Sequence, residues 1–390
     1  MELKSFNLKE DLPHSTVNIE DKKRSNLFTW RGQFSPQLVE AIICNYAKEN
    51  DVVFDPFLGS GTVLFEAALL NLSASGCEIN PAAVAFAKIY ELINKPKKAI
   101  NEELKKIEVL ISKSINSSPF DADFFESELL TAFFKEKNKI AREIMLALIT
   151  GLDFEIKKID IKRVVNVWGT LKTNIESLPE SQKELRCYHR DSRETKLHDD
   201  TIDFVLTSPP YINVFNYHQN YRKSIEKTGT NVLSVAKSEI GANRKFRQNR
   251  FLTVVQYCMD MSQVFIELNR ICKKDAKVIF IVGRESNVRR TSFKNAKLIT
   301  KVAEVCGFRL AGEQERFFTN MFGESIFEEI LRFTIVDDIK VDYFENSRKI
   351  GQAALVEALT YCDDNVKIEI EEAIVKSNEI EVSPILIAED

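Results

Sequence analysis

Short runs of β-forming residues alternate with longer stretches of helical periodicity through most of this chain. Seven runs predict strands, at 51–57, 73–79, 185–190, 202–207, 277–283, 308–317 and 327–336. Five intervals predict helices, at 36–49, 61–71, 81–94, 251–273 and 294–306. Only nine residues separate the last two strands, too few for a helical crossover, so we expect that pair to be antiparallel. The alternation elsewhere is typical of an α/β fold, with a mostly parallel sheet covered by helices on both faces.

Two segments fall outside this alternation. Residues 97–183 are rich in Lys and Glu at helical spacing and predict a helical insertion between the second and third strands. Residues 337–390 carry 14 acidic against 5 basic residues, and we expect two short helices around Asp363 and then a fraying end. The rest of the chain is net positive, and 212–250 holds eight basic and two acidic residues. One surface of the body is therefore suited to a polyanionic partner.

Composition argues against several other classes of protein. The 390 residues are 44% hydrophobic, which suffices for a packed core. No apolar run approaches the ~18–20 residues of a membrane helix, and the N-terminus is too polar for a signal peptide. The seven cysteines are scattered and never spaced as Cys-x-x-Cys, which predicts reduced thiols in a cytoplasmic protein. With four histidines, none at ligand spacing, we expect no metal site.

The first informative motif is Asp55-Pro-Phe-Leu-Gly-Ser-Gly-Thr62, where the first strand turns into a helix. Two glycines one residue apart let the backbone turn tightly and approach a ligand, and the helix N-terminus offers free amides. A phosphate-binding P-loop would need Lys after Gly61, and a dinucleotide fingerprint would need a small residue where Leu64 stands. A purely structural glycine turn explains neither Asp55-Pro56 nor the acid that follows the next strand.

Acidic residues end the next two predicted strands. Glu78 stands 17 residues beyond Gly61 and can accept hydrogen bonds from both hydroxyls of a ribose. Asp191, after the third strand, could reach the adenine amino group of the same ligand. A Glu at a strand end is usually a solvated loop residue, but its pairing with the glycine turn at this spacing favours a nucleoside-binding site.

The second informative motif is Thr207-Ser-Pro-Pro-Tyr211, directly after an apolar strand. Consecutive prolines rigidify the loop and remove two amide donors, which leaves the carbonyls of Ser208 and Pro209 free to accept hydrogen bonds. Tyr211 offers a flat face for stacking. Rigid acceptors beside an aromatic plane suit the binding of a planar exocyclic amine. A proline loop that merely ends a strand is the alternative, but this loop lies at the sheet edge where open α/β sheets bind ligands.

Together the two motifs resemble those of the S-adenosylmethionine-dependent amino-methyltransferases of DNA, which methylate the 4-amino group of cytosine or the 6-amino group of adenine. Upstream, Arg31-Gly-Gln-Phe-Ser-Pro36 is similar to the family segment that precedes the glycine loop. The resemblance covers most of 28–95 and 184–336. It implies S-adenosylmethionine as the cofactor and a Rossmann-like class I methyltransferase fold, whose seven-stranded sheet is mostly parallel with one antiparallel strand.

The resemblance also implies a role for each motif residue. The cofactor-binding residues would be Phe34, Ser35, Asp55, Phe57, Gly59, Ser60, Gly61, Thr62, Glu78, Ile79, Asp191 and Ser192. The catalytic residues would be Ser208, Pro209, Pro210 and Tyr211. Ser208 and the Pro209 carbonyl would hold the target amine while Tyr211 stacks on a base flipped out of the duplex. The motif contains no cysteine, which argues against methylation at carbon 5 of cytosine.

The residue at position 208 bears on which base is methylated. In the resembled family, Ser there is commoner among cytosine-N4 enzymes, and Asp or Asn is commoner with adenine. We therefore predict N4 of cytosine, with adenine-N6 methylation, an RNA base-amine methyltransferase and an inactive cofactor-binding subunit as alternatives. By analogy with the family, the enzyme would be the modification half of a restriction–modification system, protecting double-stranded DNA from a partner endonuclease.

Contacts to DNA are expected mainly from the basic segment. The candidates are Tyr217, Arg222, Lys223, Arg244, Lys245, Arg247 and Arg250, with a solvated lysine-rich loop as the alternative reading. The predicted division has four parts: the cofactor-binding half at 1–96, the helical insertion at 97–183 as target-recognition module or lid, the catalytic half at 184–336 and the acidic tail at 337–390. The sequence predicts neither the recognition site nor the oligomeric state.

Overall fold

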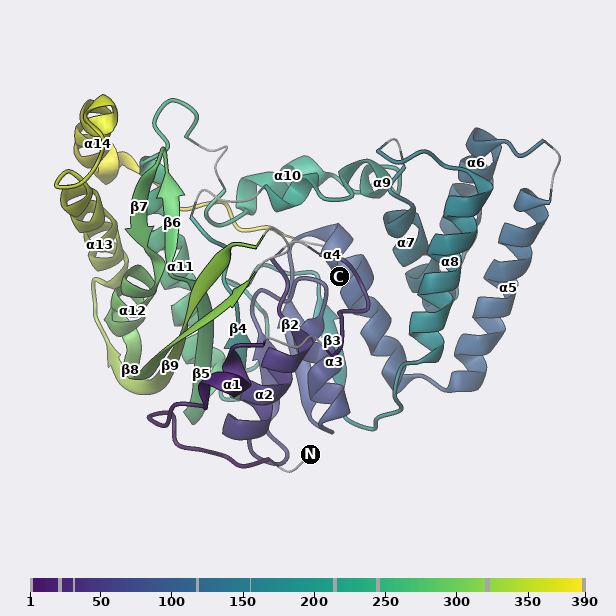
Figure 1. Ribbon diagram of the computed structural model, residues 1–390, viewed down its shortest axis with the longest axis horizontal. Coiled ribbons are helices and arrows are strands. Elements are labelled where there is room, and N and C mark those ends of the chain that lie inside the picture. The colour runs from purple at the N-terminus through teal and green to yellow at the C-terminus, as the bar shows by residue number, and fades with distance from the viewer. Residues whose placement is uncertain are drawn as a thin grey trace.

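A seven-stranded sheet forms the centre of the protein (Figure 1). The computed structural model describes residues 3–19, 23–30, 32–116, 119–154, 156–212, 216–242, 246–319 and 323–387. The strands of the sheet are β1 (Val52–Asp55), β2 (Ser73–Cys77), β3 (Leu185–Tyr188), β4 (Ile202–Thr207), β5 (Cys272–Gly283), β8 (Cys306–Thr319) and β9 (Ser325–Ile339). Their order across the sheet is β3-β2-β1-β4-β5-β9-β8.

The pairing of these strands confirms the predicted topology. β1 pairs in parallel with β2 and β4, and the parallel arrangement continues to β3 on one side and β5 on the other. β9 runs antiparallel to both β5 and β8, as expected for two strands joined by a short connection. The protein therefore has the Rossmann-like class I methyltransferase fold, with one antiparallel strand in a mostly parallel sheet.

Side chains of the central strands alternate between two cores. Val53, Phe204 and Ile279 belong to a core that also holds α2 and α3, whereas Phe54, Val205 and Phe280 belong to a second core with α11 and α12. Because both faces are covered, the central parts of these strands are continuous apolar runs, such as 278–282 of β5.

Most of the predicted helices are present, with shifted ends. The helices around the sheet are α1 (His14–Val17), α2 (Pro36–Tyr46), α3 (Thr62–Leu69), α4 (Pro81–Ala87), the 3-10 helix η1 (Lys88–Asn94), α11 (Leu252–Ile271) and α12 (Asn295–Val305). Pro36 and Pro81 open their helices in the first turn, where a missing amide costs nothing. The Asn80 side chain caps α4 by accepting a hydrogen bond from the Ala82 amide at 3.0 Å.

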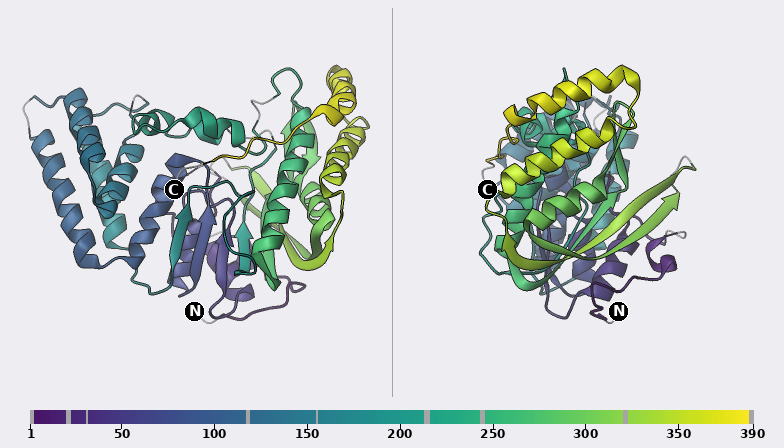
Figure 2. Two further views of the ribbon diagram at one scale, coloured as in Figure 1. Left: turned by 180° about the vertical axis from the view of Figure 1, so that it is seen from behind. Right: turned by 90° about the vertical axis from the view of Figure 1, so that its left-hand side faces the viewer.

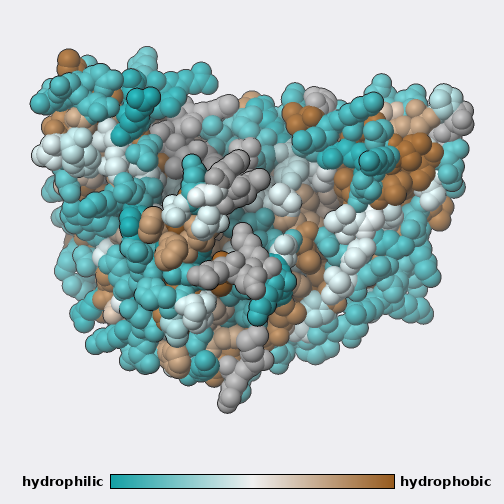
Figure 3. Space-filling model, in the orientation of Figure 1, coloured by the Kyte–Doolittle hydropathy of each residue, from teal (hydrophilic) through white to brown (hydrophobic). Residues whose placement is uncertain are grey.

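The helical insertion consists of α5 (Lys97–Ile115), α6 (Ala122–Lys135), α7 (Lys139–Leu152) and α8 (Ile161–Glu176), grouped at one end of the molecule (Figure 1). Its buried side chains join the same core as α2 and α3, so it is fused to the cofactor-binding half rather than separate from it. Lys227 also bridges to Glu126 of α6 at 2.5 Å. Exposed apolar side chains gather over α6, among them Phe124 and Phe134 (Figure 3).

Several short elements were not predicted. The segment after β4 contains η2 (Tyr217–Gln219), α9 (Arg222–Glu226) and α10 (Val232–Ser238), and β6 (Glu285–Val288) pairs with β7 (Thr291–Lys294) in a small hairpin. The hairpin turn holds Arg289 and Arg290 at φ 49° and 69°. Such turns normally use Asn or Gly, so the sequence carries no turn signal here.

The acidic tail forms the two predicted helices, α13 (Tyr343–Ala358) and α14 (Asp364–Lys376), followed by η3 (Ser377–Glu379). The expectation of a fraying end is wrong for residues 381–387, hereafter the C-terminal strap. The strap leaves α14 and crosses the protein to its middle (Figure 2). The Gln256 side chain donates to the Glu381 carbonyl at 2.8 Å, and the Ser383 amide donates to Asp260 at 2.8 Å. These hydrogen bonds hold the strap against α11.

Within the described residues, no helix combines the length and apolar character that crossing a membrane requires.

Candidate active site

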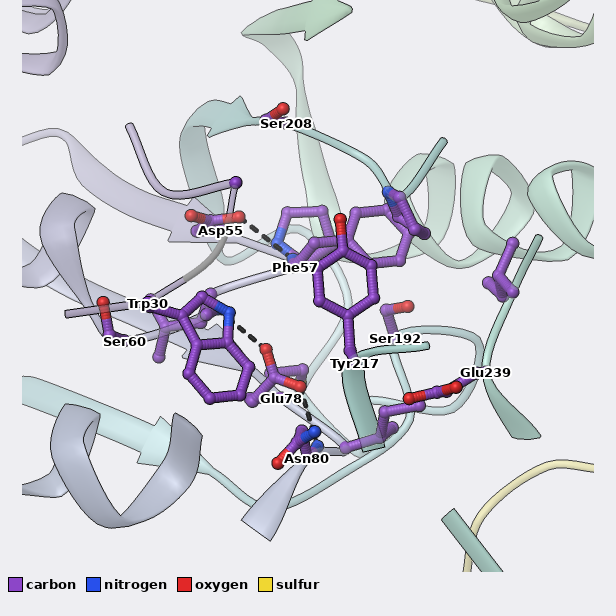
Figure 4. A pocket seen from close by; sticks show the side chains of 18 of the residues that line it. Trp30, Asp55, Phe57, Ser60, Glu78, Asn80, Ser192, Ser208, Tyr217 and Glu239 are labelled. Carbon is purple, nitrogen blue, oxygen red and sulfur yellow. Dashed lines mark hydrogen bonds between the residues drawn. The ribbon is translucent and has the colours of Figure 1, made fainter. Parts of the chain in front are cut away.

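A pocket opens at the carboxyl ends of β1, β2, β3 and β4, where a parallel sheet of this order binds its ligands. Its volume is about 890 Å³, including space open to solvent, which suits a nucleoside-sized ligand. Every predicted cofactor-binding residue except Ser35 and Gly61 lines it. In Figure 4, Asp55 and Ser208 lie on one side of the pocket, Ser192 and Glu239 on the other, and Glu78 between them.

The two glycines of the first motif have different tasks. Gly59 lines the pocket with a left-handed φ of 55°, while Gly61 (φ 93°) lies behind it at the start of α3. A Cβ on Gly61 would lie 2.7 Å from the ring of Tyr90. The turn therefore needs glycine at 61 for both conformation and space, and the predicted cofactor contact of Gly61 is not part of the pocket wall.

Asp55 connects the glycine turn after β1 to the Thr207–Tyr211 loop, which was predicted to be catalytic and is hereafter called the catalytic loop. Its buried carboxylate accepts a hydrogen bond from the Thr207 hydroxyl at 2.6 Å and one from the Phe57 amide at 3.0 Å. Burial raises the pKa of Asp55 to about 7, although both hydrogen bonds act in the opposite direction. Thr207 was not predicted as a site residue, yet it fixes Asp55 beside Ser208.

Glu78 lies at the end of β2, as predicted. Its carboxylate accepts hydrogen bonds from the Gly59 amide at 2.8 Å and the Asn80 amide at 2.7 Å, so it also holds the glycine turn. Burial raises the pKa of Glu78 to about 7, and the nearby charge of Glu239 adds to the rise. The Asn80 side-chain nitrogen is buried without a hydrogen-bond partner and belongs to a residue that lines the pocket.

The upstream segment forms another wall. Phe34 lines the pocket, as predicted, and so do Trp30 and Gln33, which were not predicted. The Gln33 side chain donates to Ser60 Oγ at 3.1 Å and accepts from the Trp30 amide at 2.8 Å. Ser35 instead precedes α2, so its predicted cofactor contact is not part of the pocket wall. Arg31 lies outside the described residues.

Asp191 lines the pocket, but its carboxylate is engaged elsewhere. Both oxygens accept hydrogen bonds from the guanidinium of Arg193, at 2.9 and 2.7 Å, and one also accepts from the Leu386 amide of the strap at 3.1 Å. Arg193 is fully buried and also donates to the carbonyls of Ser383 and Pro384. The contact predicted between Asp191 and an adenine amino group would have to compete with this ion pair.

The catalytic loop meets the same pocket. Ser208 and Pro210 line it, whereas Pro209 and Tyr211 lie just beyond its wall. The ring of Tyr211 packs close to Gly283, where a Cβ would lie 3.3 Å from it, and the hydroxyl is 3.5 Å from Glu328 of β9. Burial raises the pKa of Glu328, and Arg316 opposes that rise. The antiparallel hairpin β8–β9 thus holds Tyr211 from behind.

The basic segment after this loop is divided between the pocket and the surface. Tyr217, predicted as a DNA contact, lines the pocket together with Glu239 and Ile240. Arg222 pairs with Glu226 at 2.6 Å, whereas Lys223, Arg247 and Arg250 are exposed. Arg244 and Lys245 lie outside the described residues. No motif in this segment predicted that it would form a wall of the pocket.

The chemistry of the pocket suits a cationic nucleoside. Besides the ion-paired Asp191, three acidic side chains, Asp55, Glu78 and Glu239, line it and would favour a ligand with a sulfonium and an ammonium group. The unpartnered Asn80 amide offers a donor to the same ligand. No group of His, Cys, Asp and Glu suited to a metal ion occurs among the described residues.

Comparisons with known proteins agree with this chemistry. A family model of N6/N4 type, described as DNA methylase, matches residues 5–89. The type II methyltransferase M.MjaII of Methanocaldococcus jannaschii is 20% identical over an alignment that covers 75% of this chain and 78% of the relative. The type II methyltransferase M.BsoBI of Geobacillus stearothermophilus is 21% identical, covering 77% and 82%.

Among solved structures, a SAM-dependent methyltransferase from Methanosarcina mazei is 12% identical to this chain, with a TM-score of 0.34. The alignment covers 76% of this chain and 97% of the solved chain. A likeness at that level bears on neither fold nor function. The topology, the two motifs at one pocket and the sequence matches support one conclusion: the chain is similar to the N4/N6 amino-methyltransferases of DNA, and its cofactor is S-adenosylmethionine.

Proposed function

We propose that this protein transfers a methyl group from S-adenosylmethionine to N4 of a cytosine in double-stranded DNA. The observation that carries the proposal is that Ser208 and Pro210 of the catalytic loop line the same pocket as Asp55 and Glu78. An amine held at Ser208 would therefore adjoin the cofactor without any rearrangement of the sheet. Proximity of this kind accounts for much of the rate enhancement in a direct transfer between two bound groups.

Each residue has a defined task in the proposed reaction. The cofactor supplies an electrophilic methyl group on its sulfonium. The Ser208 side chain and the Pro209 carbonyl accept hydrogen bonds from the protons of the target amine, which localises its lone pair and aims it into the pocket. Asp55, fixed by Thr207, holds negative charge close to that point. The amine nitrogen would form a bond to the methyl carbon as the bond from that carbon to sulfur breaks, which would leave S-adenosylhomocysteine, and the nitrogen would lose one proton to solvent.

The target base must leave the duplex to reach Ser208. Tyr211 would stack on the flipped base, with its hydroxyl directed to Glu328 and its ring supported by Gly283. Arg247 and Arg250, exposed beyond the pocket wall, are the proposed phosphate contacts. The helical insertion is the proposed recognition module.

The choice of cytosine rests on Ser208, by the family preference given above. A role in a restriction–modification system, with a cognate endonuclease acting on the same site, is proposed because the curated relatives are named type II methyltransferases. Adenine N6 is the alternative target. We also propose a cytoplasmic location, where the free cysteines of this chain stay reduced.

The test is methyl transfer from labelled S-adenosylmethionine to unmethylated duplex DNA of diverse sequence and, in parallel, to bulk RNA. Products are digested to nucleosides and identified by mass spectrometry. We expect N4-methylcytosine from DNA. Ser208→Ala should lose at least about 100-fold in kcat, as expected for removal of an oriented transition-state hydrogen bond. Ser234→Ala, on the exposed side of α10, should keep full activity and is the matched control.

Other products would change the proposal in defined ways. N6-methyladenine would keep the enzyme class and overturn the base. Methylation of RNA alone would overturn the substrate, and transfer at full rate by Ser208→Ala would overturn the mechanism.

A further inference from the structure

We infer that Glu239, held in place by His218, recognises the adenine ring of the cofactor by accepting a hydrogen bond from its 6-amino group. The inference rests on the proposed function only in taking S-adenosylmethionine as the ligand of this pocket. It assigns to Glu239 the task that the sequence suggested for Asp191.

Glu239 is placed and ordered for this task. It follows α10, some 28 residues beyond the catalytic loop, yet its side chain lines the cofactor pocket and is buried. Its two oxygens accept hydrogen bonds from the backbone amide and from ring nitrogen Nδ1 of His218, each at 2.6 Å. His218 is buried as well, so the pair forms a rigid unit. Each carboxylate oxygen has two lone pairs and keeps one for a ligand.

The position of Glu239 within the pocket identifies the part of the ligand that it meets. Asp55 and Ser208 mark the end where the methyl group is transferred, and Glu78, at the end of β2, is suited to the ribose. Ser192, after β3, lies farther along the same edge of the sheet, and Glu239 lies beside it (Figure 4). A nucleoside bound through its ribose at Glu78 would extend its base toward Ser192 and Glu239.

The other acid at this end is already neutralised. Asp191 shares both oxygens with the buried Arg193 and accepts from the strap as well. Glu239, by contrast, has the His218 backbone amide and imidazole as its partners and, among the described residues, no guanidinium. An anionic acceptor favours an amino group at ring position 6 and repels a carbonyl there, so Glu239 discriminates adenine from hypoxanthine.

Binding of two ligands that differ only at that position tests the inference. The probes are S-adenosylhomocysteine and S-inosylhomocysteine, measured by isothermal titration calorimetry with the full chain. We expect the wild type to prefer the adenosyl ligand by about tenfold to a hundredfold, the usual range for a hydrogen bond to a charged group. Glu239→Gln should abolish or invert this preference, because the amide can turn a donor toward the hypoxanthine carbonyl.

Two further variants keep the test decisive. Glu239→Asp retains the charge and should retain the preference, at weaker overall affinity, even if Glu239→Gln folds poorly. Asp191→Asn is the matched carboxylate-to-amide control and should lower the unfolding midpoint while leaving the preference within twofold of the wild type. Unchanged preference in Glu239→Gln, or loss of preference in Asp191→Asn alone, would overturn the assignment. If the wild type binds neither ligand, the cofactor assignment fails with it. If it binds both equally, only the role of Glu239 fails, and the proposed methyl transfer stands.

Discussion

The affinity for S-adenosylmethionine should increase steeply as the pH rises through neutrality. Burial raises the pKa of both Asp55 and Glu78 to about 7, so each carboxyl is mostly neutral at pH 6 and mostly ionised at pH 8. A cationic cofactor binds the ionised forms. The ionised fraction of each group changes roughly tenfold across this interval, and the affinity should therefore change about 100-fold if both must ionise.

Calorimetric titration from pH 6 to pH 8 measures this change directly. Repeating each titration in buffers of different ionisation enthalpy counts the protons released, which should approach about two per cofactor at pH 6. S-adenosylhomocysteine has the same amino-acid part but no sulfonium charge and serves as the control, with a weaker pH dependence. Asp55→Asn and Glu78→Gln should each remove one of the two protons. An affinity for S-adenosylmethionine that stays within twofold across the range would refute the reasoning.

The ligand-free protein should show the opposite trend in stability. Both carboxyls titrate near 7 when folded but near 4 when unfolded, so the folded state holds more protons in between. The free energy of unfolding should then fall as the pH rises from about 5 to 7. Chemical denaturation at several pH values, with and without cofactor, measures this, and a stability that rises over the same window would contradict the assigned burial.

Substitutions at three positions extend these expectations. Gly61→Ala places a Cβ 2.7 Å from the Tyr90 ring at a φ of 93°. It should lower the free energy of unfolding, measured by urea titration, by about 1–3 kcal/mol. An unchanged free energy of unfolding would mean that the turn can relax to accept the methyl group. Tyr211→Phe should keep kcat within about tenfold whereas Tyr211→Ala should lose more than that, because the ring stacks on the base; equal losses would assign the role to the hydroxyl. Arg193→Met leaves Asp191 without its buried partner and should cost about 3–5 kcal/mol by thermal and chemical unfolding, against a loss below 1 kcal/mol if the ion pair is dispensable.

The sheet and the first wall of the pocket could be predicted because their signals are local. Apolar runs of strand length, the glycine turn and the proline loop each lie within a few consecutive residues, and parallel strands bring their carboxyl ends to one edge. Asp55, Glu78 and Ser208 therefore meet as expected.

The other walls depend on contacts between distant parts of the chain. Glu239 reaches the pocket because it directly follows α10, whose last residue, Ser238, also lines the pocket. The two helices before it, α9 and α10, have only 5 and 7 residues, too few to show a clear helical period in the sequence. Asp191 ends its strand as predicted, but Arg193, two residues on, changes what its carboxylate can do. The strap is too short to show a helical or strand pattern, and the hydrogen bonds that dock it join it to Asp260 and Arg193, which lie 123 and 190 residues away from Ser383 in the sequence.

The strap also bears on when the protein becomes functional during synthesis. Arg193 and Ser383 are 190 residues apart, so at translation rates of 5–20 residues per second roughly 10–40 s pass between their appearance. Until the strap is made, Arg193 lacks two of its carbonyl acceptors, those of Ser383 and Pro384. The pocket wall that carries Asp191 and Ser192 is then without part of its support. Contacts that span so much chain also form slowly. Assembly of the cofactor pocket is thus a late event, completed only after the strap has been made, and a chain truncated before residue 381 would lack these supporting contacts.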